Sequence, residues 1–272
     1  MSSTKTGSTG KKRKSAADAG SKSGRIHIGV GGWNFKPWRG TFYPPGLTQS
    51  RELEYASSRL TSIEINSTFY GPQKPESFQK WQAQAPEGFV FAVKGPMFAT
   101  NRRVLADGGD SIKRFLSGGV MHLGDKLGPI NWQLAPTKKF DPADLDAFLG
   151  LLPKKFEGRQ LRHAIEVRHA SFDTEAFIEL ARRHGVAIVL AADSKYPQIV
   201  DDDAPFVYAR VMGNSPQHEL GYADQELRQW ARRARAWARE GREVFLYFIS
   251  GHKEKNPAAA MALIERLGRT HA

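Results

Sequence analysis

The sequence predicts an α/β protein, a single (β/α)8 TIM barrel preceded by a disordered basic N-terminal tail. Three observations support this prediction. Strand-like segments alternate with helical or near-helical segments, which is typical of parallel βαβ units. Eight such strands occur in about 245 residues, which is the length of one α/β barrel. Polar residues recur on one face only, late in the strands, as expected where a barrel opens.

The N-terminal segment differs in composition from the rest of the chain. Residues 1–24 consist largely of Ser, Gly, Lys and Ala without an aromatic residue, so we predict a disordered basic tail before a barrel domain at 25–270. The formal net charge is +12, and half of it falls on residues 1–25. The KKRK run at 11–14 is a candidate nucleic-acid arm or localisation signal, and an ordinary solvated tail is the alternative.

Composition also bears on the cellular compartment. The chain has no cysteine, which excludes disulfides and thiolate metal sites and fits a reducing compartment. Its longest apolar run, 186–192, is too short to span a bilayer, and no signal peptide follows Met1. We therefore expect a cytoplasmic protein without membrane contact.

Hydrophobic periodicity and turn residues locate the expected elements. A doubly wound open sheet is the alternative fold, but GVGG at 29–32 lacks the spacing of a dinucleotide-binding turn. The expected helices cover 48–60, 75–84, 111–116, 142–152, 174–184 and 224–240, with a last one from 256. The expected strands are 26–30, 62–66, 89–94, 129–134, 163–168, 186–191, 206–211 and 244–249.

The segment SIEINSTFY at 62–70 shows most clearly how apolar and polar side chains alternate between the two faces of a strand. Ile63 and Ile65 share one face of the strand, whereas Glu64 and Asn66 share the other. One such strand alone indicates a half-exposed sheet. Six of the eight strands repeat the pattern, the last being ambiguous, and in a barrel their polar face becomes the mouth. The predicted mouth is lined by Glu64, Asn66, Lys94, Gln133, Glu166, Arg168, Asp193, Tyr208 and Arg210.

Three carboxylates and three cations make this ring close to neutral. Acid–base chemistry is the favoured interpretation, with a neighbouring cation keeping one carboxylate ionised while burial raises the pKa of another. A structural salt-bridge network is the alternative, because the glutamates lie one step inside the strand ends. The catalytic candidates are Glu64, Glu166 and Asp193. The substrate-binding candidates are Trp33, Asn66, Tyr70, Lys94, Gln133, Arg168, His169, Tyr208, Arg210, Asn214 and Tyr247.

We predict neither a metal nor a cofactor. The eight histidines show no HxH or HExxH spacing, and His122 and His169 meet acidic residues only through tertiary contacts. The loop SGHKEKNP at 250–257 places Gly251, Lys253 and a helix N-terminus where barrels bind phosphate. A small anionic or sugar-like substrate is therefore expected.

Seven segments resemble the YecE-like family, the domain of unknown function 72: GGWNFKPWRGTFYP (31–44), EINSTFY (64–70), FAVKGP (91–96), KLGPINWQLAP (126–136), IEVRHASF (165–172), YARVMG (208–213) and YF (247–248). The resemblance implies a TIM-barrel fold and no established activity. The chain departs from the family pattern at Ala135, Phe172, Met212, Ile249 and Ser250. If the family's chemistry used a histidine at 212, this chain would bind ligand without turnover.

The leading functional hypothesis is an enzyme performing acid–base chemistry, of hydrolase or isomerase type, on a small anionic or polyhydroxylated substrate at the barrel mouth. A nucleic-acid-binding or processing protein is the first alternative, through the tail and the arginine-rich helix 224–240. The tryptophans of that helix, Trp230 and Trp237, fall on its inward stripe, which favours an ordinary outer helix. A non-catalytic ligand-binding barrel is the second alternative, and the oligomeric state is not predicted.

Overall fold

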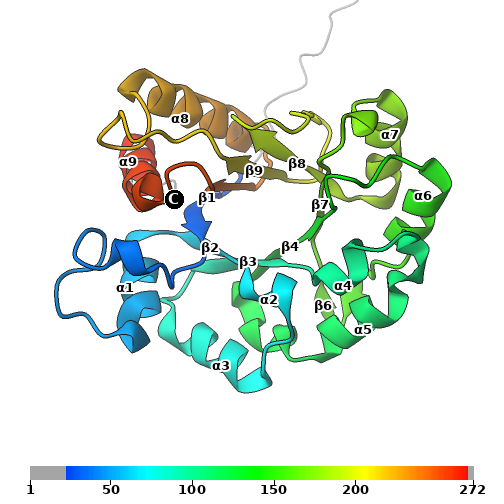
Figure 1. The fold of residues 1–272 in the computed structure, drawn as a ribbon, viewed down its shortest axis with the longest axis horizontal. Coiled ribbons are helices and arrows are strands. Elements are labelled where there is room, and N and C mark those ends of the chain that lie inside the picture. Colours follow the sequence, from blue (N-terminus) through cyan, green and yellow to red (C-terminus); the bar gives the residue numbers. More distant parts are fainter. Residues whose placement is uncertain (1–22, 269–272) are drawn as a thin grey trace, which may run out of the picture.

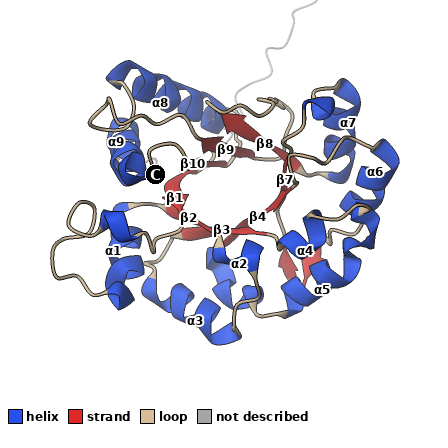
Figure 2. Ribbon diagram, viewed as in Figure 1, coloured by secondary structure: helices blue, strands red, loops and turns tan. Residues whose placement is uncertain are grey.

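The computed structural model describes residues 23–268 as a closed barrel of eight parallel strands (Figure 2). The strand order is β1-β10-β9-β8-β7-β4-β3-β2, and every neighbouring pair is parallel. The predicted barrel is thus confirmed; most of the predicted tail lies outside the described residues. The strands are β1 (Ile26–Gly31), β2 (Ser62–Ile65), β3 (Val90–Lys94), β4 (Leu127–Gln133), β7 (His163–Glu166), β8 (Ala187–Ala192), β9 (Val207–Val211) and β10 (Val244–Phe248).

Helices surround the barrel (Figure 1). The sequence did not predict the short helices α2 (Ser67–Tyr70) and α4 (Met97–Thr100), or the antiparallel hairpin β5 (Lys155–Phe156) and β6 (Arg159–Gln160). Within residues 23–268, no helix is long and apolar enough to cross a membrane. The longer helices are α1 (Glu52–Arg59), α3 (Pro75–Gln84), α5 (Gly109–Ser117), α6 (Pro142–Gly150), α7 (Glu175–His184), α8 (Asp224–Arg239) and α9 (Asn256–Leu267).

Local sequence signals explain where several helices begin and end. The carboxylate of Asp141 accepts hydrogen bonds from the amides of Ala143 and Asp144 at the start of α6. Thr174 caps α7 through its hydroxyl, and Gly185 ends that helix with φ 68°, a conformation that favours glycine. These capping residues fix the loops that join the helices to the barrel.

The connection between β8 and β9 departs from the expected alternation of strands with helical or near-helical segments. Residues 193–206 form turns and bends without a helix. The segment contains Pro197, Pro205 and the acidic run Asp201–Asp203, and it lacks the apolar spacing of an amphipathic helix. Thr48, the expected N-terminal cap of the helix at 48–60, caps no backbone amide with its side chain, because its hydroxyl contacts the Ser50 hydroxyl at 3.1 Å.

The side-chain alternation expected along the strands is confirmed by two separate apolar clusters. Residues such as Ile63, Ile65 and Val211 pack outward against the helices. Tyr208, Phe245 and a smaller set of alanines and valines fill the barrel interior. The polar residues expected at the mouth follow these packed side chains along the strands and lie toward one end of the barrel.

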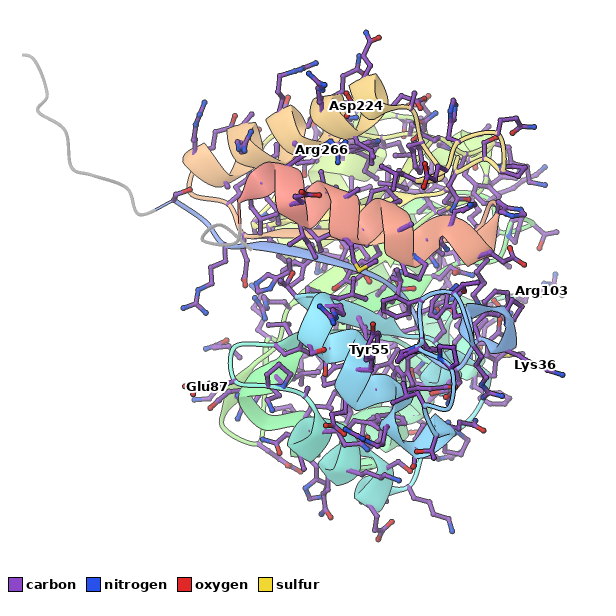
Figure 3. All side chains as sticks on the ribbon, turned by 90° about the vertical axis from the view of Figure 1, so that its left-hand side faces the viewer. Lys36, Tyr55, Glu87, Arg103, Asp224 and Arg266 are labelled. Carbon is purple, nitrogen blue, oxygen red and sulfur yellow. The ribbon has the colours of Figure 1, made fainter. Side chains whose placement is uncertain are left out.

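Figure 3 identifies that end. Glu87 precedes β3 and lies at one end of the barrel, whereas Lys36 and Arg103 follow β1 and β3 and lie at the other. The same view shows α8 and α9 side by side, joined by the ion pair of Asp224 and Arg266 at 2.5 Å. Because the strands are parallel, their carboxyl ends meet at the end marked by Lys36 and Arg103, where sites of TIM barrels lie.

A Gly29→Ala substitution is expected to lower the free energy of unfolding by about 1–3 kcal/mol. A β-carbon at Gly29 would stand 1.8 Å from the backbone oxygen of Ser62 on β2, so the paired strands must separate. Urea denaturation measures the change. Gly71→Ala is the matched control, because Gly71 has extended backbone and no atom within 4 Å of the added carbon. Equal stability of the two variants would contradict the close approach of β1 and β2.

Candidate active site

Arg210 forms the centre of the candidate site. It lies on β9, and its guanidinium bridges two fully buried carboxylates. Nη2 donates to Oε1 of Glu64 on β2 at 3.1 Å, and Nη1 donates to Oε2 of Glu166 on β7 at 2.7 Å. Because charge-assisted hydrogen bonds are strong where water is excluded, the bridge holds the three side chains in one arrangement.

Two neutral side chains add hydrogen bonds to the carboxylates. The Tyr208 hydroxyl donates to Oε2 of Glu64 at 2.7 Å. Nδ2 of Asn131 on β4 lies 3.3 Å from Oε2 of Glu166 and 3.5 Å from Oε2 of Glu64. Side chains from four strands thus converge on one point inside the barrel.

Lys94 lies at the end of β3, close to this centre. Its Nζ donates to Oε1 of Gln133 at 2.7 Å and stands 4.1 Å from the ring centroid of Phe69. The backbone oxygen of Lys94 accepts a hydrogen bond from the Thr68 hydroxyl at 2.7 Å, which fixes α2 beside β3. The aromatic ring of α2 therefore covers the amine.

Arg168 occupies the most open position of the group. It follows β7, donates Nε to Oε1 of Glu166 at 2.8 Å, and its guanidinium lies 4.7 Å from the ring centroid of Tyr196. Its side chain is 17% exposed, whereas that of Arg210 is 4% exposed. A ligand that approaches from solvent therefore meets Arg168 before it meets the centre.

The charges of this group do not cancel. Lys94, Arg168 and Arg210 carry three positive charges, and Glu64 and Glu166 carry two negative charges. The third carboxylate expected from the sequence lies elsewhere, as described below. These five residues, with Tyr208, Asn131 and Gln133, are hereafter the mouth cluster. The cluster keeps one unbalanced positive charge among mostly buried groups, and such a site attracts anions.

Glu166 is ionised at neutral pH. Burial opposes its ionisation, but Arg210, Arg168 and Lys94 outweigh burial and lower the pKa of the carboxyl. Burial also opposes the charge of Arg210, but the two glutamates outweigh it and raise the pKa of the guanidinium. Glu166 thus lacks the proton that a general acid must carry, and its charge state suits a base.

Lys94 is the group of the mouth cluster that titrates near neutrality. Burial and the charge of Arg210 lower the pKa of its amine to about 8, although Glu64 and Glu166 act in the opposite direction. A group with a pKa close to working pH exchanges protons readily. Lys94 is therefore placed to gain or lose a proton during a reaction.

Two buried polar atoms of the mouth cluster have no hydrogen-bond partner among the described residues. They are Nε of Arg210, a donor, and Oδ1 of Asn131, an acceptor. Leaving such groups without a partner costs about 1–3 kcal/mol each. An ordered water or an atom of a ligand can complete such bonding.

A separate cleft of about 220 Å³ lies at the same end of the barrel, between the loops that follow β1, β2 and β10, and no charged residue of the mouth cluster lines it. Trp33, Asn66 and Lys253 are among its lining residues. Lys253 stands 4.3 Å from the ring centroid of Phe35, and its backbone oxygen accepts a hydrogen bond from Nε1 of Trp38 at 3.0 Å. Because Trp38 is fully buried, the loop that carries this cation is held in place.

The structure does not bring Asp193 into the mouth cluster. Asp193 has φ 54°, and its side chain lies beside Trp230 and Arg233 of α8. Burial, followed by the charge of Glu226, raises the pKa of its carboxyl. The pattern placed Asp193 one step beyond β8, where the backbone turns away and the alternation of faces ends.

His169 and Asn214 serve local structure. Nδ1 of His169 accepts a hydrogen bond from the backbone amide of Ser171 and caps the short turn after Arg168. Nδ2 of Asn214 donates to the backbone oxygen of His252 at 3.0 Å, so Asn214 joins the loops that follow β9 and β10.

The three remaining aromatic candidates lie around the mouth cluster in different ways. Tyr247 is fully buried below it, where its hydroxyl shares a 2.7 Å hydrogen bond with Ser62. Tyr70 is 70% exposed at the end of α2. Trp33 packs edge-on against Trp81 with centroids 5.3 Å apart, and it also lines the cleft.

Sequence reasoning missed Asn131 and Phe69 as members of the candidate site. Asn131 carries the same alternation signal as Gln133, since both stand on the inward face of β4. Phe69 carried no such signal, because its position over Lys94 depends on the helical turn α2. Met212 and Ile249, which depart from the family pattern, are buried and apolar.

Within residues 23–268, no group of three or more histidine, aspartate or glutamate side chains gathers in a way that could hold a metal ion. The buried histidines His27 and His163 form hydrogen bonds with the Glu243 carboxylate and with the backbone oxygen of Pro153, respectively.

The fold and the mouth cluster define an α/β TIM-barrel protein with a charged site at the carboxyl ends of its strands. The family model described as "Protein of unknown function DUF72" matches residues 27–272, and the chain belongs to this family. The resemblance found in the sequence motifs is therefore confirmed.

Two curated relatives are named as UPF0759 proteins. The "UPF0759 protein YecE" of Escherichia coli (strain K12) is 30% identical over 150 residues, which are 54% of this chain and 50% of that protein. The "UPF0759 protein YunF" of Bacillus subtilis (strain 168) is 33% identical over 69 residues, which are 25% of this chain and 23% of that protein. The chain spans about half the length, or less, of the curated relatives it matches.

Solved structures show the same fold. A DUF72 family protein from Thermotoga maritima superposes with a TM-score of 0.70 at 20% identity, over 89% of this chain and 98% of that one. A DUF72 family protein from Enterococcus faecalis gives 0.69 at 17% identity, over 90% and 98%. A structure titled SacUVDE gives 0.55 at 12% identity, over 90% and 99%. At these identities the likeness concerns the fold alone.

Proposed function

We propose that this protein is an enzyme that binds a small anionic, polyhydroxylated compound at the barrel mouth and moves a proton with a buried carboxylate. The observation that carries the proposal is the unbalanced positive charge of the mouth cluster, together with the unpartnered Nε of Arg210. A network that only filled the barrel would gain most from neutral charge and complete hydrogen bonding. An anionic oxygen of a ligand would supply what the cluster lacks.

The residues of the mouth divide into two roles. Arg168 stands nearest the opening, and its cationic group suits a phosphate or carboxylate of the ligand, whereas Lys94 lies deeper in the mouth. Glu166 is ionised and suits proton abstraction, with Glu64 as the second candidate. The cleft that contains Asn66 and Lys253 offers polar groups for hydroxyls or for a second anionic group.

Access to the mouth cluster requires a small ligand. Glu64, Glu166 and Tyr208 are fully buried, whereas Arg168 reaches solvent. The separate cleft of about 220 Å³, which these residues do not line, has the volume of a single sugar or a three-carbon phosphate. The burial of the charged groups favours a small molecule over nucleic acid as the ligand of the mouth cluster.

Ribose 5-phosphate and glycerol 3-phosphate are expected to raise the melting temperature of the full chain, and Arg168→Ala is expected to weaken their binding about tenfold. The reason is the loss of a bidentate cation at the opening, and a tenfold change corresponds to about 1.4 kcal/mol. Thermal shift followed by calorimetric titration measures both effects.

Arg183→Ala is the matched control, because Arg183 is an exposed arginine on the outer helix α7. Ribose without phosphate and a short single-stranded oligonucleotide complete the panel. Stabilisation by the oligonucleotide alone, unchanged in Arg168→Ala, would contradict the proposed function and favour nucleic-acid binding by the basic surface.

A further inference from the structure

We infer that Lys94 is a nucleophilic amine that forms a Schiff base with the aldehyde or ketone group of the substrate. This inference rests on the proposed function and narrows its substrate class to carbonyl compounds that carry an anionic group. It starts from the surroundings of the Lys94 amine, which differ from those of a structural lysine.

Lys94 is buried without a direct anionic partner. Among the described residues its Nζ makes no salt bridge, and its hydrogen-bond acceptor is the neutral amide oxygen of Gln133. By contrast, Lys138 pairs with the carboxylate of Asp144 at 2.6 Å. A lysine kept only for structure is paired when it is buried, because an unpaired buried charge is costly.

The environment of the amine favours its neutral, nucleophilic form. Burial keeps water from the amine, and the guanidinium of Arg210 repels its positive charge. Both effects contribute to the pKa of about 8. An amine with this pKa is partly neutral at physiological pH, whereas an ordinary surface lysine is almost fully protonated.

The neighbouring side chains suit the steps of imine formation. The neutral Nζ attacks the carbonyl carbon, and the C=O double bond opens to a carbinolamine. Loss of water, whose two hydrogens come from the amine, leaves a C=N bond, and a proton from solvent gives the protonated imine. The carboxylates of Glu64 and Glu166 lie close enough to stabilise this cation. No oxidant or reductant is needed.

The protonated imine explains why the Lys94 amine lies in the same cluster as the base Glu166. A protonated imine acidifies the C–H bonds next to it, and Glu166 is an ionised carboxylate in the same cluster. Arg168, at the opening, would hold the anionic end of the substrate. Lys94, Glu166 and Arg168 thus form a set that suits an anionic aldehyde or ketone.

Reductive trapping on the full chain tests the inference. The protein is incubated with glyceraldehyde 3-phosphate and cyanoborohydride, digested, and mapped by mass spectrometry. Lys94 is expected to carry the reduced three-carbon adduct at least about tenfold faster than the exposed lysines Lys74 and Lys113, and the labelling rate is expected to rise with pH and level off above about 8.

Two controls separate the outcomes. Lys94→Arg keeps the charge and is expected to lose this adduct. If that variant fails to fold, the map of labelled lysines in the wild type decides the test by itself. Glycerol 3-phosphate has no carbonyl group and is expected to bind and to slow labelling. If it binds while Lys94 stays unlabelled, the Schiff base is overturned and the proposed function stands. If neither phosphate binds and Lys94 stays unlabelled, both are overturned.

Discussion

An Arg210→Met variant is expected to lose about 3–5 kcal/mol of the free energy of unfolding at pH 7. Removal of the guanidinium leaves Glu64 and Glu166 buried, with their shared cation gone. Urea denaturation followed by tryptophan fluorescence measures the loss. Arg228→Met is the control, since Arg228 is an exposed arginine paired with Asp224 on α8, and its change is expected to stay within about 0.5 kcal/mol.

The loss caused by Arg210→Met is expected to shrink as the pH falls. In the wild type, burial opposes ionisation of Glu166 but the three cations keep its pKa below the ordinary value, so its stabilising contribution is present at neutral pH and is lost on acidification. In the variant, burial without Arg210 raises that pKa, so protonation stabilises the fold. A difference between the two proteins that stays constant from pH 7 to about pH 4 would contradict this account.

A Glu166→Gln variant is expected to lose proton transfer by a factor of about 10²–10⁴ while it retains anion binding. The amide keeps the shape of the carboxylate and cannot take a proton, and the removal of one negative charge makes the mouth cluster more positive. Exchange of the C–H hydrogens of glyceraldehyde 3-phosphate with deuterium from solvent, followed by NMR, measures proton transfer.

Glu87→Gln is the matched control for this variant, because Glu87 lies at the opposite end of the barrel (Figure 3). It should exchange deuterium at the wild-type rate. If Glu166→Gln exchanges as fast as the wild type, Glu166 is not the base, and Glu64→Gln becomes the variant to test.

Much of the fold follows from the sequence because strand alternation is a local signal. Glu64, Glu166 and Arg210 each stand among apolar residues with period two, and a closed barrel turns all such inward positions toward one axis. Their meeting within hydrogen-bond distance could therefore be predicted as a group, although not as particular pairs.

The remaining features depend on where the alternation ends. Asp193 and Asn214 lie beyond their strands, in loops whose path depends on tertiary contacts with α8 and with the loop after β10. The placement of Phe69 over Lys94 requires the turn of α2, which four residues cannot signal in sequence. The predicted near-neutral ring differs from the observed cluster for the same reason. Asp193 lies outside the cluster, so two carboxylates face three cations.

If the mouth cluster binds an anionic ligand and does more than fill the barrel, its arginines must respond to that ligand. NMR spectra of the arginine side-chain Nε–H groups, recorded during a titration with ribose 5-phosphate, measure this response. The signals of Arg168 and Arg210, assigned with lysine substitutions, are expected to shift together and to saturate, while that of Arg228 on α8 stays fixed. Shifts confined to Arg228 and other exposed arginines, with Arg168 and Arg210 unmoved, would contradict the claim and identify the mouth cluster as a structural network.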